Sequence, residues 1–139
     1  MNAKEYLSQV MRIDQRINSK LEQLQKLRAS STKATATLSD MPRPESPDLQ
    51  RLETTVAKIV DLENEINRDI DTLVNLRGEI YHLIQTVQDV NQQLLLELRY
   101  LCFKSWREIA EMMGLEERYV LKVHGRALNA VGKIISKWE

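Results

Sequence analysis

Residues 105–123 read SWREIAEMMGLEERYVLKV, and this stretch decides the fold of the C-terminal part of the chain. Ser105 followed three residues later by Glu108 is the pattern of a capping box, which starts a helix. Gly114 tolerates a left-handed backbone, so it can end that helix and open a turn. The stretch therefore predicts a short helix after Ser105, a turn at Gly114, and a longer helix over about 116–137.

Small and apolar residues in this stretch have the spacing of a helix-turn-helix. Ala110 supplies a small residue where two helices would cross, four residues before Gly114. The positions that would hold the two helices together are Ile109, Met113, Leu115, Val120 and Val123. In a helix-turn-helix the second helix enters the major groove of DNA. An ordinary helical hairpin inside a bundle is the alternative explanation of the same pattern.

Upstream of this motif, residues 49–94 carry a heptad pattern, which predicts coiled-coil packing. One column is apolar throughout: Leu52, Ile59, Ile66, Leu73, Ile80, Val87 and Leu94. The other is Leu49, Val56, Glu63, Ile70, Arg77, Ile84 and Asn91, and its polar members either set register and partner number or mark a wetter seam. Ser46 as N-cap and Pro47 predict the start of this helix, and we expect an end or kink near Asp89.

The N-terminal segment, residues 2–28, has one apolar face and therefore needs a partner helix. Its apolar residues are Tyr6, Val10, Ile13, Ile17, Leu21, Leu24 and Leu27. Residues 29–46 are rich in Ser and Thr and contain Pro42 and Pro44, which predicts a flexible linker. This linker is long enough for the two helical segments to pair within one chain or between two chains.

The composition indicates a cytoplasmic, mainly helical protein. Of 139 residues, 20 are basic and 20 acidic, so global basicity gives no argument for nucleic-acid binding. Residues 97–139 alone carry 8 basic and 6 acidic residues. The single cysteine, the lack of an apolar run of membrane length and the polar N-terminus predict no disulfide, no membrane partner and no signal peptide.

These patterns predict an all-α protein in two parts. Residues 1–88 would form an antiparallel helical hairpin or coiled coil with a linker at about 29–46, and residues 89–139 a helix-turn-helix bundle. His124 lacks companions at metal-ligand spacing, and no phosphate-binding loop or catalytic triad spacing can be found. We therefore expect no enzyme activity, no metal and no cofactor, and we expect Cys102 to be a core residue.

The C-terminal part resembles region 4 of bacterial RNA polymerase sigma factors, the module that reads the −35 promoter element and contacts the polymerase. The resemblance rests on LLELRYL at 95–101, SWREIA at 105–110, Val120 and RAL at 126–128. Together with VHGRAL at 123–128, these residues look closer still to small phage and prophage proteins with a sigma-like C-terminus. The resemblance spans roughly residues 79–135, and sigma region 2 has no counterpart, so a complete sigma factor is not expected.

The resemblance also implies which residues would face DNA. On the second helix they are Glu117, Arg118, Tyr119, Lys122 and Arg126, while Arg99, Lys104 and Arg107 would contact flanking phosphates. Arg118 suits bidentate contact with guanine, and the carboxylate of Glu117 suits the cytosine amino group. The pair Glu116–Glu117 departs from what phosphate binding favours, because carboxylates repel phosphate.

The sequence thus predicts a sequence-specific DNA-binding transcriptional regulator of phage type, with double-stranded DNA and RNA polymerase as partners. The coiled coil would make it a homo-oligomer, with a dimer expected first. A non-enzymatic coiled-coil interaction or scaffold protein is the alternative that the neutral charge and Glu116–Glu117 favour. A small terminase-like DNA-packaging subunit is a third alternative, although there the helix-turn-helix would be expected ahead of the oligomerisation segment.

Overall fold

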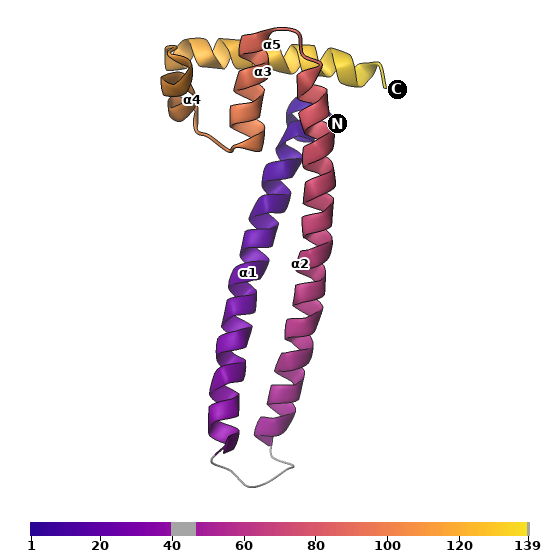
Figure 1. The fold of residues 1–139 in the computed structure, drawn as a ribbon, viewed down its shortest axis with the longest axis vertical. Helices are drawn as coiled ribbons and strands as arrows, with labels where there is room; N and C mark the ends of the chain where they lie inside the picture. The colour runs from indigo at the N-terminus through magenta and orange to yellow at the C-terminus, as the bar shows by residue number, and fades with distance from the viewer. Residues whose placement is uncertain (40–46, 139) are drawn as a thin grey trace. The chain divides into compact units, whose positions relative to one another are not determined.

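The computed structural model describes residues 1–39 and 47–138, apart from the side chains of 34–39 and 48. The described residues form helices joined by short turns, without a strand, so the all-α class is confirmed (Figure 1). In chain order the helices are α1 (Ala3–Ser39), α2 (Pro47–Gln85), α3 (Val90–Leu96), the π-helical turn η1 (Glu97–Leu101), α4 (Trp106–Met113) and α5 (Glu117–Ser136).

The chain forms two compact units, and their limits differ from the expected boundary at residue 88. One unit consists of Gln15–Thr72, and we call it the hairpin unit. The other, which we call the C-terminal unit, combines Leu73–Glu139 with Met1–Asp14. Burial explains this grouping: the C-terminal unit has a core made of Leu7, Val10, Ile80, Leu83, Ile84, Val87, Leu96, Tyr100, Ala127 and Val131. The first turns of α1 and the last turns of α2 therefore supply apolar side chains that α3 and α5 need for their own burial.

In the hairpin unit, α1 and α2 pair in antiparallel fashion within one chain (Figure 1). The seam buries Ile17 and Leu24 of α1 together with Leu62 and Ile66 of α2. Two ion pairs flank this seam: Lys20 Nζ lies 2.6 Å from Asp69 Oδ2, and Arg28 Nη2 lies 2.8 Å from Glu63 Oε1. The partner number falls from 69 to 63 as the α1 number rises from 20 to 28, which is the mark of antiparallel pairing.

The prediction of a flexible linker over 29–46 is wrong for residues 29–39, because α1 continues to Ser39. Thr32 shows how the helix accommodates its hydroxyl-bearing residues: its Oγ1 donates a hydrogen bond to the carbonyl of Arg28, 3.0 Å away. Ser and Thr lower helix propensity by only about half a kcal/mol each, so neighbouring alanines can offset them. Residues 40–46, with Pro42, Pro44 and the expected cap at Ser46, lie outside the described residues.

The break between α2 and α3 lies where the sequence predicts it. Helix α2 starts at Pro47, passes through Gly78 without interruption and ends at Gln85. Asp89 then caps α3, because its Oδ1 accepts a hydrogen bond of 3.0 Å from the backbone N–H of Gln92. A side chain that satisfies a free N–H at the start of α3 gives the chain a stable place to change direction.

The polar residues in the second heptad column make specific contacts or leave α2 altogether. Glu63 forms the ion pair with Arg28. Nη1 of Arg77 donates a hydrogen bond of 3.0 Å to the carbonyl of Leu101, which lies at the end of η1. Asn91 belongs to α3. In this chain, Glu63 and Arg77 of this column therefore connect α2 to other segments, one through a salt bridge and the other through a hydrogen bond to a helix end.

The segment between α3 and α4 departs from a simple helix end. The π-helical turn η1 ends at Leu101, and Phe103 has a φ of 58°, which is unusual for an aromatic residue. Cys102, expected in the core, is exposed, since it follows the last residue of η1 and belongs to this connecting segment. Such departures cost energy locally, so other contacts must hold the segment in place.

Candidate nucleic-acid interface

Helix α4 begins and ends at the residues predicted for it. Ser105 Oγ accepts a hydrogen bond of 3.2 Å from the N–H of Glu108, and the N–H of Ser105 donates one of 3.4 Å back to Glu108 Oε1. The capping box is thus confirmed. Gly114 has φ 67° and ψ 34°, the left-handed conformation expected for the turn. These local signals fix the start and the end of α4, and α5 begins after a short connection.

One apolar cluster holds α3, η1, α4 and α5 together. Its buried members are Leu95, Leu98, Ile109, Ala110, Val120 and Val123, with Trp106, Met113 and Leu115 packed against them. All five apolar residues expected between the two helices therefore belong to one cluster. Helix α5 also contributes Ala127 and Val131 to the main core of the C-terminal unit. One side of α5 is buried along much of its length, and its other side is exposed.

The exposed side of α5 carries a row of basic residues. Arg118, Lys122 and Arg126 are all exposed and follow one another at intervals of four residues. Since each residue turns the helix by about 100°, this spacing keeps the three side chains on one side. The exposed Lys133 falls within the same sector, and Lys137 follows directly after the helix. We call Arg118, Lys122, Arg126 and Lys133 the basic row.

Acidic residues are absent from the sequence between the first residue of the basic row and residue 138. Residues 118–138 contain five basic residues and no Asp or Glu, although the whole chain has zero net charge. The carboxylates nearest to the row along the sequence are the exposed Glu116 and Glu117 at the start of α5. Helix geometry places Glu117 about 100° from Arg118 and about 140° from Lys122 around the axis. Their repulsion of an anion is thus confined to one end and one flank of α5.

Lys133 and Lys137 escaped the sequence-based prediction, which stopped at Arg126. The resemblance to sigma region 4 directed attention to the start of the second helix. The signal that identifies the later lysines is the acid-free run from 118 to 138. A local count of charges along one helix reveals it, whereas a count over the whole chain averages it away.

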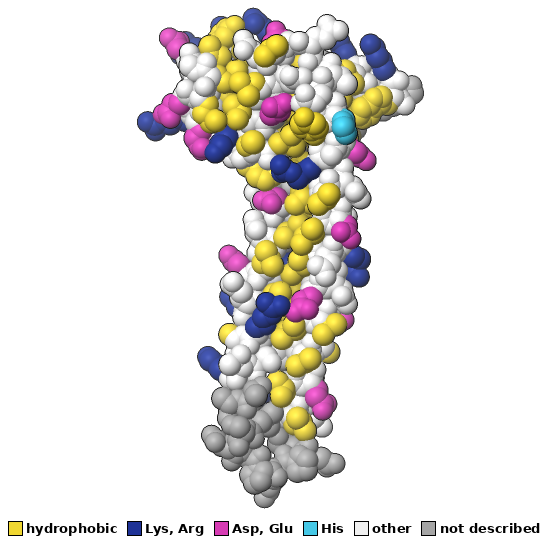
Figure 2. Space-filling model, in the orientation of Figure 1, with side chains coloured by type: hydrophobic (Ala, Val, Ile, Leu, Met, Phe, Trp, Pro, Cys, Tyr) yellow, Lys and Arg dark blue, Asp and Glu magenta, His cyan; other side chains and the backbone are white. Residues whose placement is uncertain are grey.

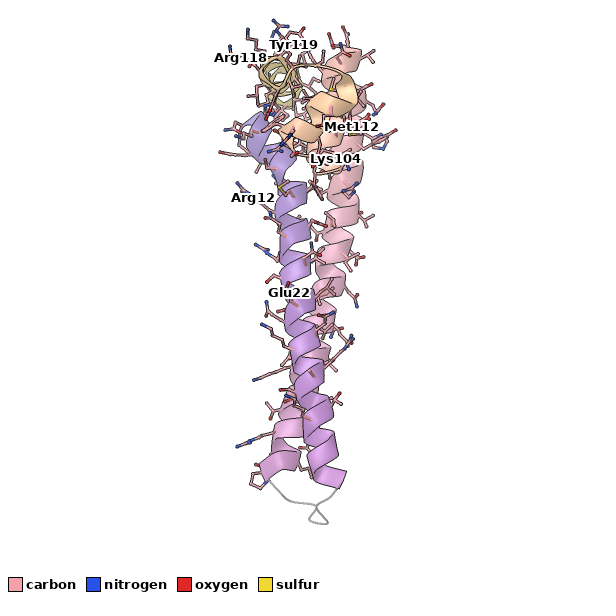
Figure 3. All side chains as sticks on the ribbon, turned by 90° about the vertical axis from the view of Figure 1, so that its left-hand side faces the viewer. Arg12, Glu22, Lys104, Met112, Arg118 and Tyr119 are labelled. Carbon is pink, nitrogen blue, oxygen red and sulfur yellow. The ribbon has the colours of Figure 1, made fainter. Side chains whose placement is uncertain are left out.

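The remaining predicted residues of α5 and α4 are also at the surface. Figure 3 shows Arg118 and Tyr119 projecting outward from the start of α5, and Tyr119 is exposed. Arg107 is exposed on the first turn of α4. Lys104 precedes α4 and is half-buried, with its Nζ 3.9 Å from Glu108 Oε2. Arg107 and Lys104 therefore lie outside α5 and do not extend the basic row.

Arg99 has a different environment from the other predicted phosphate contacts. Its guanidinium carbon lies 4.1 Å from the ring centre of Trp106, and its Nη1 donates a hydrogen bond of 3.0 Å to the carbonyl of Lys104. These contacts connect η1 to the first residue of α4 and to the segment that contains Phe103. Arg99 therefore has a structural contribution: it holds the connection whose backbone is strained at Phe103.

His124 is a buried polar residue on the inner side of α5. Its Nε2 and the hydroxyl of Tyr100 share a hydrogen bond of 2.7 Å, and the ring of Trp106 lies edge-on with centroids 4.5 Å apart. Burial lowers the pKa of His124 to about 4, with smaller contributions from the positive charges of Arg99 and Lys4. His124 is therefore neutral at physiological pH and belongs to the core of the module.

Burial also raises the pKa of Tyr100 to about 12, so the pair with His124 carries no charge near neutral pH. Among residues 1–39 and 47–138, no three His, Cys, Asp or Glu side chains gather in a way that could hold a metal ion. No helix in the same ranges is both long and apolar enough to cross a membrane.

Comparison of this chain with protein-family models, with curated proteins and with solved structures finds no match.

Proposed function

We propose that this chain is a sequence-specific DNA-binding transcriptional regulator of phage type, in which α4 and α5 act as a helix-turn-helix. The observation that carries the proposal is the basic row on α5, in a stretch without acidic residues. The opposite side of α5 is buried against the rest of its unit. A helix that packs on its unit with one side and exposes cations on the other suits insertion into the major groove of DNA. That groove is wide enough to admit one α-helix.

The residues of the basic row would each make a different kind of contact with DNA. Arg118, near the start of α5, suits the bidentate contact to the O6 and N7 atoms of guanine. Lys122 and Arg126 would read base edges or neighbouring phosphates. Lys133 lies about 22 Å further along the helix than Arg118, at a rise of 1.5 Å per residue, so it would meet the sugar-phosphate backbone. Glu117, on the flank, would accept a hydrogen bond from a cytosine amino group.

The resemblance to sigma region 4 supports RNA polymerase as the second partner. A single helix-turn-helix makes few base contacts, so a partner that also binds the promoter would raise the effective concentration of the module at its site. The surface of α4 and α5 also exposes apolar side chains, namely Met112, Tyr119 and Leu121. Such residues are of little use against phosphate but suit a protein surface.

The experiment that tests the proposal is the selection of binding sites from a random pool of DNA duplexes with the purified full-length protein. Enrichment of a motif is the expected result, and a motif with two-fold symmetry would indicate two copies on one site. Selection is repeated with RNA polymerase present, since a sigma-like module can require it. Absence of a motif in both selections, with no salt-dependent binding to any duplex, contradicts the proposal.

Salt dependence adds a quantitative test of the row. Each phosphate contact contributes about 0.9 to the slope of log affinity against log salt. Lys133→Ala should therefore reduce the slope by about 1 and weaken all sequences alike. Lys58→Ala, an exposed lysine in the hairpin unit, is the matched control and should leave the slope unchanged.

A coiled-coil interaction protein is the second candidate, and the exposed Met112, Tyr119 and Leu121 favour it. If this candidate is right, no duplex should be enriched in the selection, and Leu121→Ser should abolish capture of purified RNA polymerase while Arg118→Ala leaves that capture intact. Loss of binding to a selected DNA motif in Arg118→Ala favours the DNA-binding function, whatever Leu121→Ser does to capture of the polymerase.

A further inference from the structure

The hairpin unit buries one seam and leaves a second apolar surface uncovered. Outside the seam, four large apolar side chains are between 41% and 49% exposed: Leu21, Val56, Val60 and Ile70. Two helices packed side by side have only one mutual face, so side chains that lie beside that face stay in contact with water. Burial of these side chains against another surface would be favourable.

All four side chains lie on the same flank of the hairpin. The ion pairs define its two flanks, Arg28–Glu63 on one and Lys20–Asp69 on the other. Counting about 100° per residue from Ile66, which faces α1, places Ile70 about 40°, Val56 about 80° and Val60 about 120° toward the side of Glu63. The same count from Ile17 on α1 places Leu21 about 40° toward the side of Arg28. Figure 2 shows hydrophobic side chains running along the hairpin on the face that it draws.

The two flanks differ in chemistry. The flank that contains Leu21, Val56, Val60 and Ile70, which we call the apolar flank, extends about 120° from the seam, and the charged residues within it are the ion pair Arg28–Glu63. Glu22, Glu53 and Asp71 follow about 20° further, at its outer edge. The opposite flank carries charged and polar residues, namely Arg16, Lys20, Gln23, Lys58, Glu65 and Asp69. An amphipathic hairpin of this kind has the pattern of half of a helical bundle.

We propose that the apolar flank is the interface between two copies of this chain, which together form a four-helix bundle over residues 15–39 and 47–72. A two-fold interface must complement itself, and this flank does so because it is apolar and the two charges within it, Arg28 and Glu63, are opposite. A strongly acidic or basic partner would find no excess of opposite charge within the flank. The inference does not depend on DNA binding, since it uses none of the residues of the basic row.

The size of the hairpin agrees with an interface to a second copy of this chain. The 25 residues of α1 in the hairpin unit, at 1.5 Å each, and two helix diameters of about 10 Å give a face of about 750 Å². A stable specific interface buries about 800 Å² on each partner. The hairpin thus offers nearly the area that a dimer needs, and the pair Arg28–Glu63, which is exposed in the single chain, would become buried and set the register of the dimer.

Light scattering and sedimentation equilibrium of the full-length chain at several concentrations test the proposal. The wild type should have twice the chain mass of 16.2 kDa. Val60→Lys and Ile70→Lys should each raise the dissociation constant of the dimer at least tenfold, because an unpaired charge would be buried at the interface. Each of these side chains is about half exposed in the single chain, so helical content by circular dichroism should stay unchanged.

Gln23→Lys is the matched control, since it adds the same charge to an exposed position on the opposite flank. It should leave the mass at the dimer value. A wild-type chain that stays monomeric overturns the proposal and leaves the apolar flank for a different protein. A dimer, or a larger assembly, that neither Val60→Lys nor Ile70→Lys weakens also overturns it, because another surface would then be the interface.

Discussion

The C-terminal unit and the hairpin unit treat their apolar residues in opposite ways. In the C-terminal unit, the apolar residues predicted between α4 and α5 join a cluster with Leu95 and Leu98, and most are buried. In the hairpin unit, Ile66 of the apolar column is buried and Leu52 and Ile59 are half-buried, whereas Val56 and Ile70 of the other column are exposed. Three helices around one point can enclose a core, but two helices cannot. The difference indicates where a second molecule is needed to complete the burial.

The charges of the two units differ as well. Helix α5 gathers cations without anions from residue 118 onward, while the hairpin unit pairs its charges across the seam at Lys20–Asp69 and Arg28–Glu63. Surface ion pairs contribute little to stability, about 0–1 kcal/mol each. The cations of α5 have no such anionic neighbours along the helix from residue 118 onward, and this is the contrast on which the proposed anionic ligand rests.

The largest contrast should come from placing a charge in each unit. Ala110→Glu would bury a carboxylate among Ile109, Val120 and Val123, and it should destabilise the fold by roughly 3–5 kcal/mol. Val60→Lys at low protein concentration should cost less than about 1 kcal/mol, because its side chain already meets water. Thermal and denaturant unfolding measure both. Met112→Glu, exposed on the same helix as Ala110, is the control and should have little effect.

DNA binding should distinguish matched arginines of the two units. Arg118→Ala should weaken specific binding by about 1–3 kcal/mol and relax selectivity at one base pair. Arg68→Ala, exposed in the hairpin unit, should change affinity by less than about 0.5 kcal/mol. Fluorescence anisotropy with the selected duplex and with point-substituted duplexes measures both effects. Equal losses in the two variants would show that the basic row has no special part in binding.

The stability of the C-terminal unit should depend on pH through His124. Its pKa is about 4 in the folded chain and about 6.5 when unfolded, so between these values the unfolded chain binds the extra proton. The stabilisation is therefore fully present above about pH 6.5 and is lost as the pH falls toward 4. Since one pKa unit corresponds to about 1.4 kcal/mol and solvent screens part of it, the loss should be roughly 2 kcal/mol.

Unfolding free energies at a series of pH values, for the wild type and for His124→Gln, measure this loss. The glutamine variant cannot titrate, so its stability should vary less over the same interval. Carboxylates titrate equally in both proteins and cancel in the difference. Identical pH profiles for the two proteins would mean that His124 is as accessible to protons in the folded chain as in the unfolded one.

The smallest contrast concerns two glycines, one in a turn and one inside a helix, whose replacement by alanine should change the free energy of unfolding in opposite directions. Gly114→Ala should destabilise by about 1 kcal/mol, because a Cβ is strained at a φ of 67° even though open space surrounds it. Gly78→Ala, inside α2 with no atom within 4 Å of a new Cβ, should stabilise by about 0.5–1 kcal/mol. Thermal melting at neutral pH measures both. A stabilising effect at Gly114 would show that the turn relaxes to another conformation.

Much of the helical layout follows from local signals in the sequence. The capping box at Ser105–Glu108, the turn at Gly114 and the break at Asp89 act between residues at most four apart, and all three are as predicted. The prediction of a linker was wrong over 29–39 because packing between distant segments outweighed a local signal. Weak helix formers do not stop a helix whose earlier turns already pack on a neighbouring helix. The limit of the linker cannot be deduced from propensity alone.

The candidate site was predicted in part. The sequence places Arg118, Lys122 and Arg126 on one side of a helix, and the structure exposes all three. It did not indicate that Arg99 packs on Trp106, nor that His124 pairs with Tyr100. In the last case the two residues are 24 positions apart, and their meeting depends on how η1 and α5 pack.

The sequence by itself determined the all-α class, the main helix starts and turns in the described residues, and the acid-free stretch from 118 to 138. These properties depend on neighbours along the chain, because helix hydrogen bonds and caps join residues three or four apart. Only the tertiary structure decided that the ends of α1 and α2 join the C-terminal core, that His124 is buried and neutral, and that Val60 and Ile70 stay exposed. Burial depends on which distant segments meet, and the helical period alone does not say how many faces of a helix will find a partner.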